Sequence, residues 1–253
     1  MTEITRALAR AFASLAHPRM LGLMIWPLAV ALVLWTVLAI IFGAQTVAWL
    51  QGYLTTSAVG VWASHWFPFN VIAAVLSWVA LFVLFVPLVL VTATLIIGVV
   101  AMPAMVRHVA AADYPSLERR HGGTFAGSVW NALAALAVFV VLSLLSLPLW
   151  FVPLFWPVLP VLLFAYLNQR VFRYDAVAEH ASGEEMRELF RRYGKQLYLL
   201  GIILSLIAHI PLVGFFIPVI AGLAFIHYGL DRLGALRRAG AQEQPLPATR
   251  LES

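Results

Sequence analysis

Three long runs of the chain contain no Asp, Glu, Lys or Arg, and they dominate its pattern of hydrophobic and polar positions. The runs cover residues 20–106, 121–169 and 196–230, and most of their side chains are apolar. A helix that crosses a membrane needs about 20 apolar residues, so each run can hold at least one crossing. The pattern therefore predicts an all-α integral membrane protein.

The first run divides at its most polar part, residues 44–70, which contains Gln, Thr and Ser together with tryptophans. Tryptophan is enriched where the membrane meets water. We therefore expect a long transmembrane helix over residues 21–42, a surface loop over residues 44–70, and a second long helix from residue 71 to about residue 112. Pro87 and Pro103 are expected to kink the second helix.

The second run is interrupted by prolines, which cluster in residues 148–160 with the sequence PLWFVPLFWPVLP. Proline lacks an N–H and disfavours helix in the preceding residue, so the cluster predicts a turn between two helices within residues 124–167. This first hairpin crosses the membrane fully or partly. Lipid cannot satisfy the polar backbone of such a turn, so we expect the turn to be buried. It then either packs tightly against neighbours or a second subunit, or lines a path for a polar solute.

The third run has the same design in residues 208–218, AHIPLVGFFIP. Pro211, Gly214 and Pro218 are expected to break it into two arms. At about 1.5 Å per residue, neither arm can cross about 30 Å of hydrocarbon. This second hairpin is therefore expected to be only partly inserted.

Amphipathic segments flank these hydrophobic runs. In residues 181–197, Ser182 and Glu185 have the spacing of a capping box, and apolar residues recur at helical intervals between basic ones. Residues 4–15 show a weaker version of the pattern. We expect both segments to lie on the cytoplasmic interface with their basic side chains on anionic headgroups; a regulatory or partner-binding role is the alternative.

Composition supports the membrane class and adds an orientation. The chain is 63% hydrophobic and 11% charged, with a mean hydropathy of +0.94. Its basic residues lie in the N-terminal segment, in residues 107–120 and 170–195, or after residue 230. The positive-inside rule then places these segments and both termini in the cytoplasm. We expect one helical membrane domain over residues 1–240 and a disordered tail over residues 241–253.

Candidate chemistry is sparse. The chain has no cysteine, and we find no grouping of nucleophile, acid and base, or metal ligands. We expect no enzyme activity, catalytic residue, cofactor or metal, and no nucleic-acid partner. The proposed spans also contain no carboxylate, whereas ion-driven transporters usually place acidic residues there. This favours a channel or facilitator.

A few polar residues remain as candidates for a site. Ser205 and His209 lie one helical turn apart before the second hairpin's turn, where they either cap broken backbone or meet a solute. Tyr174, Asp175 and His180 form a cytoplasmic polar cluster, which either joins the two hairpins as a structural cap or acts in gating. His65 and His227 are expected at the membrane interface.

Several short motifs resemble the CysZ sulfate permease family and its wider relatives, the etoposide-induced protein family. The first is ARAFASLAHPRMLGLMIWPLAVAL, where Phe12, Leu15, Pro18 and the pair Pro27 and Leu28 match the family's pattern. The others are YDAVAEH, EEMRELFRRYG and IPLVGFFIPV, and the resemblance extends to about residue 238. It implies two long transmembrane helices, two partly inserted helical hairpins and a homo-oligomer in the bacterial inner membrane.

The resemblance also implies a function, the passive or weakly coupled uptake of sulfate. Family members typically carry Pro-Gly-x-Arg-Arg at the turn before the first long helix, and the arginines meet the anion. Here the turn contains His17, Pro18 and Arg19, so one displaced arginine replaces the pair. Arg19 and His17 are the candidate anion-binding residues, and interfacial anchoring is the alternative role of Arg19. The competing function is a membrane-structural or partner-binding protein without transport activity.

Overall fold

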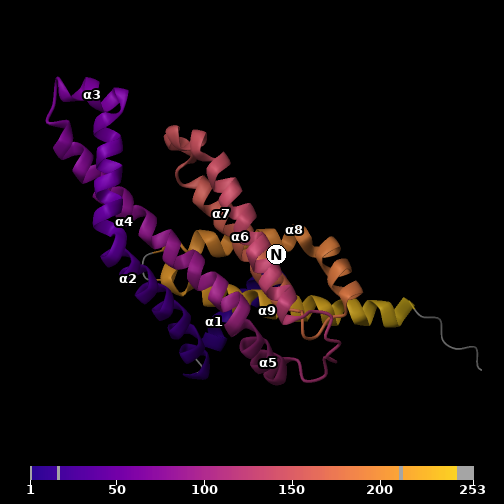
Figure 1. Ribbon diagram of the computed structural model, residues 1–253. Coiled ribbons are helices and arrows are strands. Elements are labelled where there is room, and N and C mark those ends of the chain that lie inside the picture. Colours follow the sequence, from indigo (N-terminus) through magenta and orange to yellow (C-terminus); the bar gives the residue numbers. More distant parts are fainter. Residues whose placement is uncertain (1, 16–17, 211–212, 244–253) are drawn as a thin grey trace, which may run out of the picture. The chain divides into compact units, whose positions relative to one another are not determined.

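The chain folds into helices joined by turns and by one longer irregular segment, residues 114–124, in the computed structural model, which describes residues 2–15, 18–210 and 213–243 (Figure 1). No strand occurs in these residues. The α-helices are α1 (Thr2–Leu15), α2 (Pro18–Thr56), α3 (Ala58–Ser64), α4 (Phe69–Ile96), α5 (Met102–Asp113), α6 (Phe125–Leu145), α7 (Val158–Asp175), α8 (Gly183–Ile207) and α9 (Val213–Glu243). A π-helical turn, η1 (Ile97–Ala101), and two 3₁₀ turns, η2 (Leu147–Phe151) and η3 (Pro153–Phe155), complete them.

The all-α membrane class predicted from the sequence is confirmed. Five segments are long and apolar enough to cross a membrane: Ile25–Thr56, Phe69–Asp113, Phe125–Leu145, Pro153–Asp175 and Phe216–Gln242. The helices form two compact units, Ile25–Ala93 and the described parts of Met1–Met24 and Thr94–Ser253.

The unit Ile25–Ala93 contains most of α2, all of α3 and most of α4. Ala31 packs against Val89 and Ala93, and Trp35 donates a hydrogen bond from Nε1 to Oγ1 of Thr92 at 2.9 Å. Ala31 and Ala93 are small residues, which are enriched where helices meet in lipid.

The surface loop expected over residues 44–70 is wrong in its conformation, because α2 continues to Thr56 and α3 follows at once. Thr46 and Thr56 donate their hydroxyls to carbonyls four residues earlier, so these polar residues fit inside a helix. Tryptophans in this part of the chain remain largely exposed: Trp49, Trp62 and Trp66. Their exposure agrees with an interfacial position.

The second long helix extends as predicted, through α4, η1 and α5 to Asp113. Pro87 lies within α4 without ending it, while Pro103 lies in the first turn of α5, directly after η1. Proline cannot donate the backbone hydrogen bond of a continuing α-helix, and the π-helical turn accommodates the change in register.

The first hairpin forms as predicted, with α6 and α7 side by side and antiparallel (Figure 1). The rings of Phe139 and Phe164 lie 5.8 Å apart, and Asn131 near the other end donates to the carbonyl of Arg170 at 2.8 Å. Its turn at residues 146–157 consists of η2 and η3.

Within a single chain this turn is exposed, since Phe151 is 89% exposed and Leu154 is 76% exposed, and its burial against a second copy stays a prediction. The physical reason for the exposure is that the turn satisfies much of its own backbone. The amides of Leu149, Val152, Phe155 and Trp156 all donate to carbonyls three residues earlier, and the indole of Trp156 donates to the carbonyl of Trp150 at 2.7 Å. A turn with its donors satisfied in this way can face an apolar environment without protein around it.

The second hairpin differs from its prediction in two respects. Residues 183–197 do not form a separate surface helix but the first half of α8, whose predicted capping box is present at Ser182 and Glu185. Pro218 lies inside α9 and does not break it, and Pro211 lies outside the described residues. The chain therefore turns earlier, after Ile207, where a Cβ on Gly214 would stand only 2.2 Å from the carbonyl oxygen of Ala208.

Helix α9 is the central helix of its unit and contacts α1, α5, η1, α7 and α8. Nearly every side chain from Ile217 to Leu230 is buried. A helix that is apolar on all sides is typical of such a position. Its length also exceeds the short arm expected from the sequence, because the helix continues beyond the last uncharged residue to Glu243. The depth to which this hairpin inserts stays a prediction.

The N-terminal helix α1 packs on α9, and its buried face differs from the predicted apolar stripe. Ile4, Ala7 and Ala11 are buried, whereas Phe12 is 45% exposed. The small side chains of Ala7 and Ala11 are one turn apart and allow a close approach between helices. Contact with α9 therefore holds α1 in place. Its position at the membrane interface stays a prediction.

Candidate functional site

The predicted anion-binding turn lies at the edge of the described structure. His17 lies outside the described residues, and for Arg19 the structure describes the backbone but not the side chain. That backbone belongs to the first turn of α2, which begins at Pro18. The first four N–H groups of a helix lack partners within it and favour anions, so the position suits the predicted role without testing it.

A polar network joins α1, the end of α5 and α9. Two of its members, Arg10 and Ser14, lie shortly before this turn in the chain. We call it the α1–α9 network; its members are Glu3, Arg10, Ser14, Asp113, Tyr114, His227, Asp231 and Arg232. Ser14 Oγ lies 3.0 Å from Nε2 of His227, whose side chain is 1% exposed. Tyr114 accepts from Nη1 of Arg10 at 3.0 Å and donates to the carbonyl of His227 at 3.1 Å.

Charged pairs extend this network along both helices. Arg232 of α9 pairs with Glu3 of α1 at 2.6 Å, and Arg10 of α1 lies 3.8 Å from Asp231. The guanidinium of Arg232 also lies over the rings of Tyr193 and Tyr228. Burial raises the pKa of Tyr114, so its hydroxyl stays protonated and can donate.

A cavity of about 300 Å³ opens beside the network. Arg10, Ser14 and His108 bring polar groups to its wall, and the carboxylate of Asp113 lies on the same wall. Arginine and hydroxyl donors can hold an oxyanion, and the nearby carboxylate limits how strongly one is held. The cavity therefore suits brief contact with a small anion better than tight binding.

The ring of His227 is buried inside the protein, where α1 and α5 enclose it, and its expected position at the membrane interface stays a prediction. His227 lies in the uncharged run of residues 196–230, and this feature of the sequence could have indicated that its side chain is buried in the protein. A histidine in the middle of a buried helix needs polar partners, and Ser14 supplies one. Those partners lie more than a hundred residues away in the chain, so the sequence pattern could not pair them.

For His65 the structure shows an exposed side chain whose Nδ1 lies 2.8 Å from the carbonyl of Val61.

The three residues of the predicted cytoplasmic cluster, Tyr174, Asp175 and His180, lie together around the turn between α7 and α8. A second segment, residues 120–123, runs along this turn. The amides of Arg120, His121, Gly122 and Gly123 donate to the carbonyls of His180, Glu179, Ala181 and Ala178 respectively. A Cβ on Gly122 or Gly123 would stand 2.4 to 2.5 Å from the opposite segment, so this pairing requires both glycines.

Arginine side chains fasten the same turn to α9. Arg237 donates to both carboxylate oxygens of Glu185, at 2.9 and 3.0 Å, and to the carbonyl of His180 at 2.6 Å. Arg120 donates to Glu185 at 2.8 Å. Burial lowers the pKa of His180, which is 1% exposed, so the buried ring favours its neutral form. These contacts join α7, α8 and α9, which agrees with a structural cap at this turn. A role of the cluster in gating stays a prediction.

The predicted pair Ser205 and His209 lies at the end of α8. His209 Nδ1 lies 2.8 Å from the carbonyl oxygen of Ser205, so its ring caps a carbonyl in the last turn of the helix. Ser205 is buried, and its hydroxyl has no partner among the residues that the structure describes. The capping geometry is therefore present, and contact with a solute stays untested.

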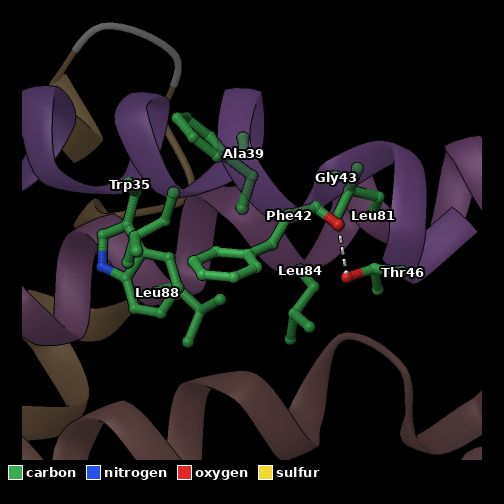
Figure 2. A pocket seen from close by; sticks show the side chains of 10 residues that line it. Trp35, Ala39, Phe42, Gly43, Thr46, Leu81, Leu84 and Leu88 are labelled. Carbon is green, nitrogen blue, oxygen red and sulfur yellow. Dashed lines mark hydrogen bonds between the residues drawn. The ribbon is translucent and has the colours of Figure 1, made fainter.

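The unit Ile25–Ala93 holds a different kind of pocket, of about 250 Å³ (Figure 2). Figure 2 shows Trp35, Phe42 and Leu88 around it, and the bond from Thr46 to the carbonyl of Phe42 at its edge. Because its lining is almost wholly apolar, the pocket suits a hydrocarbon group and not an anion. In the part of the chain that the structure describes, no group of three His, Asp or Glu residues is arranged to hold a metal ion.

Comparison with known proteins gives one match. The family model described as "Sulfate transporter CysZ/Etoposide-induced protein 2.4" matches residues 7–218. This range contains the turn before α2, the first hairpin and the turn between α7 and α8. No curated protein and no solved structure matches the chain.

Proposed function

Because the chain belongs to the sulfate transporter CysZ and etoposide-induced protein family, we propose that it lets a small oxyanion, sulfate, cross the membrane down its concentration gradient. The family match over residues 7–218 is the observation that carries this proposal. The chain is a helical membrane protein, so a membrane activity is consistent with its fold.

Two features near the start of α2 support the proposal. Arg19 lies in the first turn of this helix, where free N–H groups favour an anion. The α1–α9 network places Arg10 and Ser14 shortly before that turn, and both residues line the cavity of about 300 Å³. Together these residues provide donors along one stretch of the chain, although the family's paired arginines are absent. A weakly held anion can leave again, as passage through a channel requires.

The proposal includes a location and an assembly. We infer a bacterial inner membrane with both termini in the cytoplasm, from the positive-inside distribution of the basic residues. We also infer a homo-oligomer, which the family resemblance implies; large apolar side chains such as Phe82, Phe151 and Leu154 are more than 70% exposed within one chain. Lipid or a second copy of the chain is expected to cover them.

The alternative is a membrane-structural or partner-binding protein without transport activity. The missing arginine pair favours it, since paired charge-assisted hydrogen bonds give the strongest recognition of a tetrahedral oxyanion. A scaffold needs no polar path through the membrane, whereas a transport protein does. The two functions therefore differ in a direct measurement of flux.

Purified protein reconstituted into lipid vesicles tests the proposal. Labelled sulfate should enter these vesicles faster than protein-free vesicles, and unlabelled sulfate or selenate should compete while chloride should not. Uptake no faster than in protein-free vesicles would leave the structural alternative as the better account.

A further inference from the structure

Arginines gather on the surface where α7 packs against α8, which we call the α7–α8 surface. Among the residues that the structure describes, Arg170 and Arg173 of α7 and Arg187 of α8 make no ion pair with a carboxylate. Arg191, one turn after Arg187, is in contrast paired with Glu188 at 2.7 Å. The charges of the first three arginines are therefore available to an anion outside the chain.

A contact between Arg173 and Phe190 brings these arginines together. The guanidinium carbon of Arg173 lies 4.9 Å from the centre of the Phe190 ring. Such a contact uses the face of the guanidinium and leaves its N–H edge for an acceptor. Arg170 lies three residues before Arg173, and Arg187 lies three residues before Phe190, so each shares a helix face with its neighbour. All three arginines thus surround one point of the α7–α8 surface.

Open space lies beside this point, at Gly194. This glycine follows Phe190 by one helical turn, and a Cβ built on it would meet no atom within 4 Å. Gly201 lies on the same face of α8, where a Cβ would stand 2.7 Å from the carbonyl oxygen of Ala165. The two helices are therefore in close contact at Gly201, and the surface opens toward Gly194 and the arginines.

The α7–α8 surface changes from charged to aromatic to apolar along both helices. On one face of α7 the half-buried or exposed side chains are, in order, Arg173, Arg170, Tyr166 and Leu162. On the matching face of α8, Tyr198 and then Ile202 follow Gly194 at intervals of one turn. Leu162 is 40% exposed, so the apolar end is accessible from outside the chain.

This order matches the parts of a phospholipid. Arginines form charge-assisted hydrogen bonds with phosphate, tyrosine favours the boundary between headgroup and hydrocarbon, and leucine and isoleucine contact acyl chains. A free phosphate or sulfate ion could use only the arginines. The apolar half of the surface therefore favours a lipid over a soluble anion.

We propose that the α7–α8 surface binds an anionic phospholipid, with its phosphate on Arg170, Arg173 and Arg187 and its acyl chains along Leu162 and Ile202. The amphipathic pattern of residues 181–197 indicated headgroup contacts along that segment alone, and the structure adds the two arginines of α7. Binding of the lipid requires no sulfate transport, so this proposal and the proposed function fail separately.

Native mass spectrometry of the purified full-length protein in detergent tests the site. The protein is titrated with phosphatidylglycerol or with phosphatidylcholine of the same acyl chains, and the wild type should bind phosphatidylglycerol more tightly. Arg170→Gln/Arg173→Gln should weaken this binding about thirtyfold, since each basic residue near an anionic headgroup contributes about 1 kcal/mol.

Arg192→Gln/Arg238→Gln is the matched control, because it removes the same charge from exposed positions elsewhere. Arg192 is two residues from both Phe190 and Gly194, which places it about 200° around α8 from the α7–α8 surface. This control should bind phosphatidylglycerol as the wild type does. An equal loss in both double variants would mean general attraction between charges and would overturn the proposal.

Gly194→Leu tests the site without removing a charge, which is needed if the α7 variant fails to fold. It fills the open space beside Phe190 and should abolish the preference for phosphatidylglycerol while elution from a sizing column stays unchanged. The proposal is overturned if the wild type shows no such preference, or if either folded variant of the surface keeps the wild-type affinity. Displacement of the bound lipid by inorganic phosphate or by a polyglutamate peptide would assign the surface to a soluble anion and would overturn it too.

Discussion

Ser14 and His227 lie 3.0 Å apart, between Oγ and Nε2, and this contact fastens the end of α1 to the buried middle of α9. Three further side chains of α1 support the attachment from the same face: Ile4, Ala7 and Ala11. The N-terminal helix is thus part of the folded unit just before the turn that carries Arg19.

Replacement of Ser14 by Ala should destabilise the protein by about 1 kcal/mol, because it leaves one nitrogen of the buried His227 ring without a partner. Unfolding in detergent measures the change, and cleavage by trypsin after Arg6 and Arg10 should become faster. Ser64→Ala is the control, since Ser64 is exposed and its hydroxyl bonds only a carbonyl of its own helix. Equal stability of the two variants would show that the contact with His227 contributes nothing.

Replacement of Arg237 by Gln should cost about 2 kcal/mol, in the range for loss of a hydrogen bond to a charged group, because this pair is partly exposed. The substitution removes both bonds to Glu185 and the bond to the carbonyl of His180. Arg238→Gln provides a matched control at the next position, where the side chain is exposed. Thermal unfolding compares the two, and a similar loss in both variants would contradict the structural role of Arg237.

Stability should fall in acid through His180 and Glu185. Burial lowers the pKa of His180. Burial alone would raise the pKa of Glu185, but hydrogen bonds from Arg237 and from the amide of Ser182 lower it below its usual value. Both folded-state pKa values lie below the unfolded ones. The contribution of each group to folding stability is therefore complete above its unfolded pKa, about 6.5 for His180 and about 4.3 for Glu185. This contribution is lost as the pH falls.

Unfolding temperatures measured from about pH 8 down to about pH 4 check this sign. The wild-type protein should lose stability as the pH drops below the ordinary histidine value, and Glu185→Gln should lose less in the lower part of the range because its amide does not titrate. A stability that rises toward acid would contradict the assignment.

Topology can be read with single cysteines, because the chain has none of its own. Gly183→Cys should react with an impermeant thiol reagent only from the cytoplasmic side, and Ser64→Cys only from the opposite side. Both positions are exposed in the structure, so accessibility does not favour one of them. Labelling of residue 183 from outside intact cells would contradict the placement of the basic segments.

Much of the fold could be predicted from the sequence, because uncharged runs and prolines report the length of a helix and where it ends. The first hairpin, the capping box at Ser182 and the extent of the second long helix all follow from such local rules. The exposure of the turn over residues 146–157 within a single chain could not be predicted. Its amides bond to carbonyls only three residues away, and this choice of partner depends on backbone angles that composition does not reveal.

The candidate sites were harder to predict, because they depend on residues distant in the chain. Tyr174, Asp175 and His180 can be grouped because they are neighbours in sequence, but the residues near them in the structure, Thr124, Ser128 and Arg237, come from distant parts of the chain. The partners of His227 could not be predicted for the same reason. A charge pattern shows which residues avoid lipid, and only the packed structure shows what they contact.

Sulfate flux through the reconstituted protein tests the central claim most directly. Vesicles with the same sodium buffer on both sides receive labelled sulfate outside, and three proteins are compared: the wild type, Arg19→Ala, and Arg238→Ala as the control. The account predicts that wild type and Arg238→Ala admit sulfate until the inside and outside concentrations are equal, and that Arg19→Ala admits it more slowly. Sulfate entry into wild-type vesicles at the rate of protein-free vesicles would contradict it.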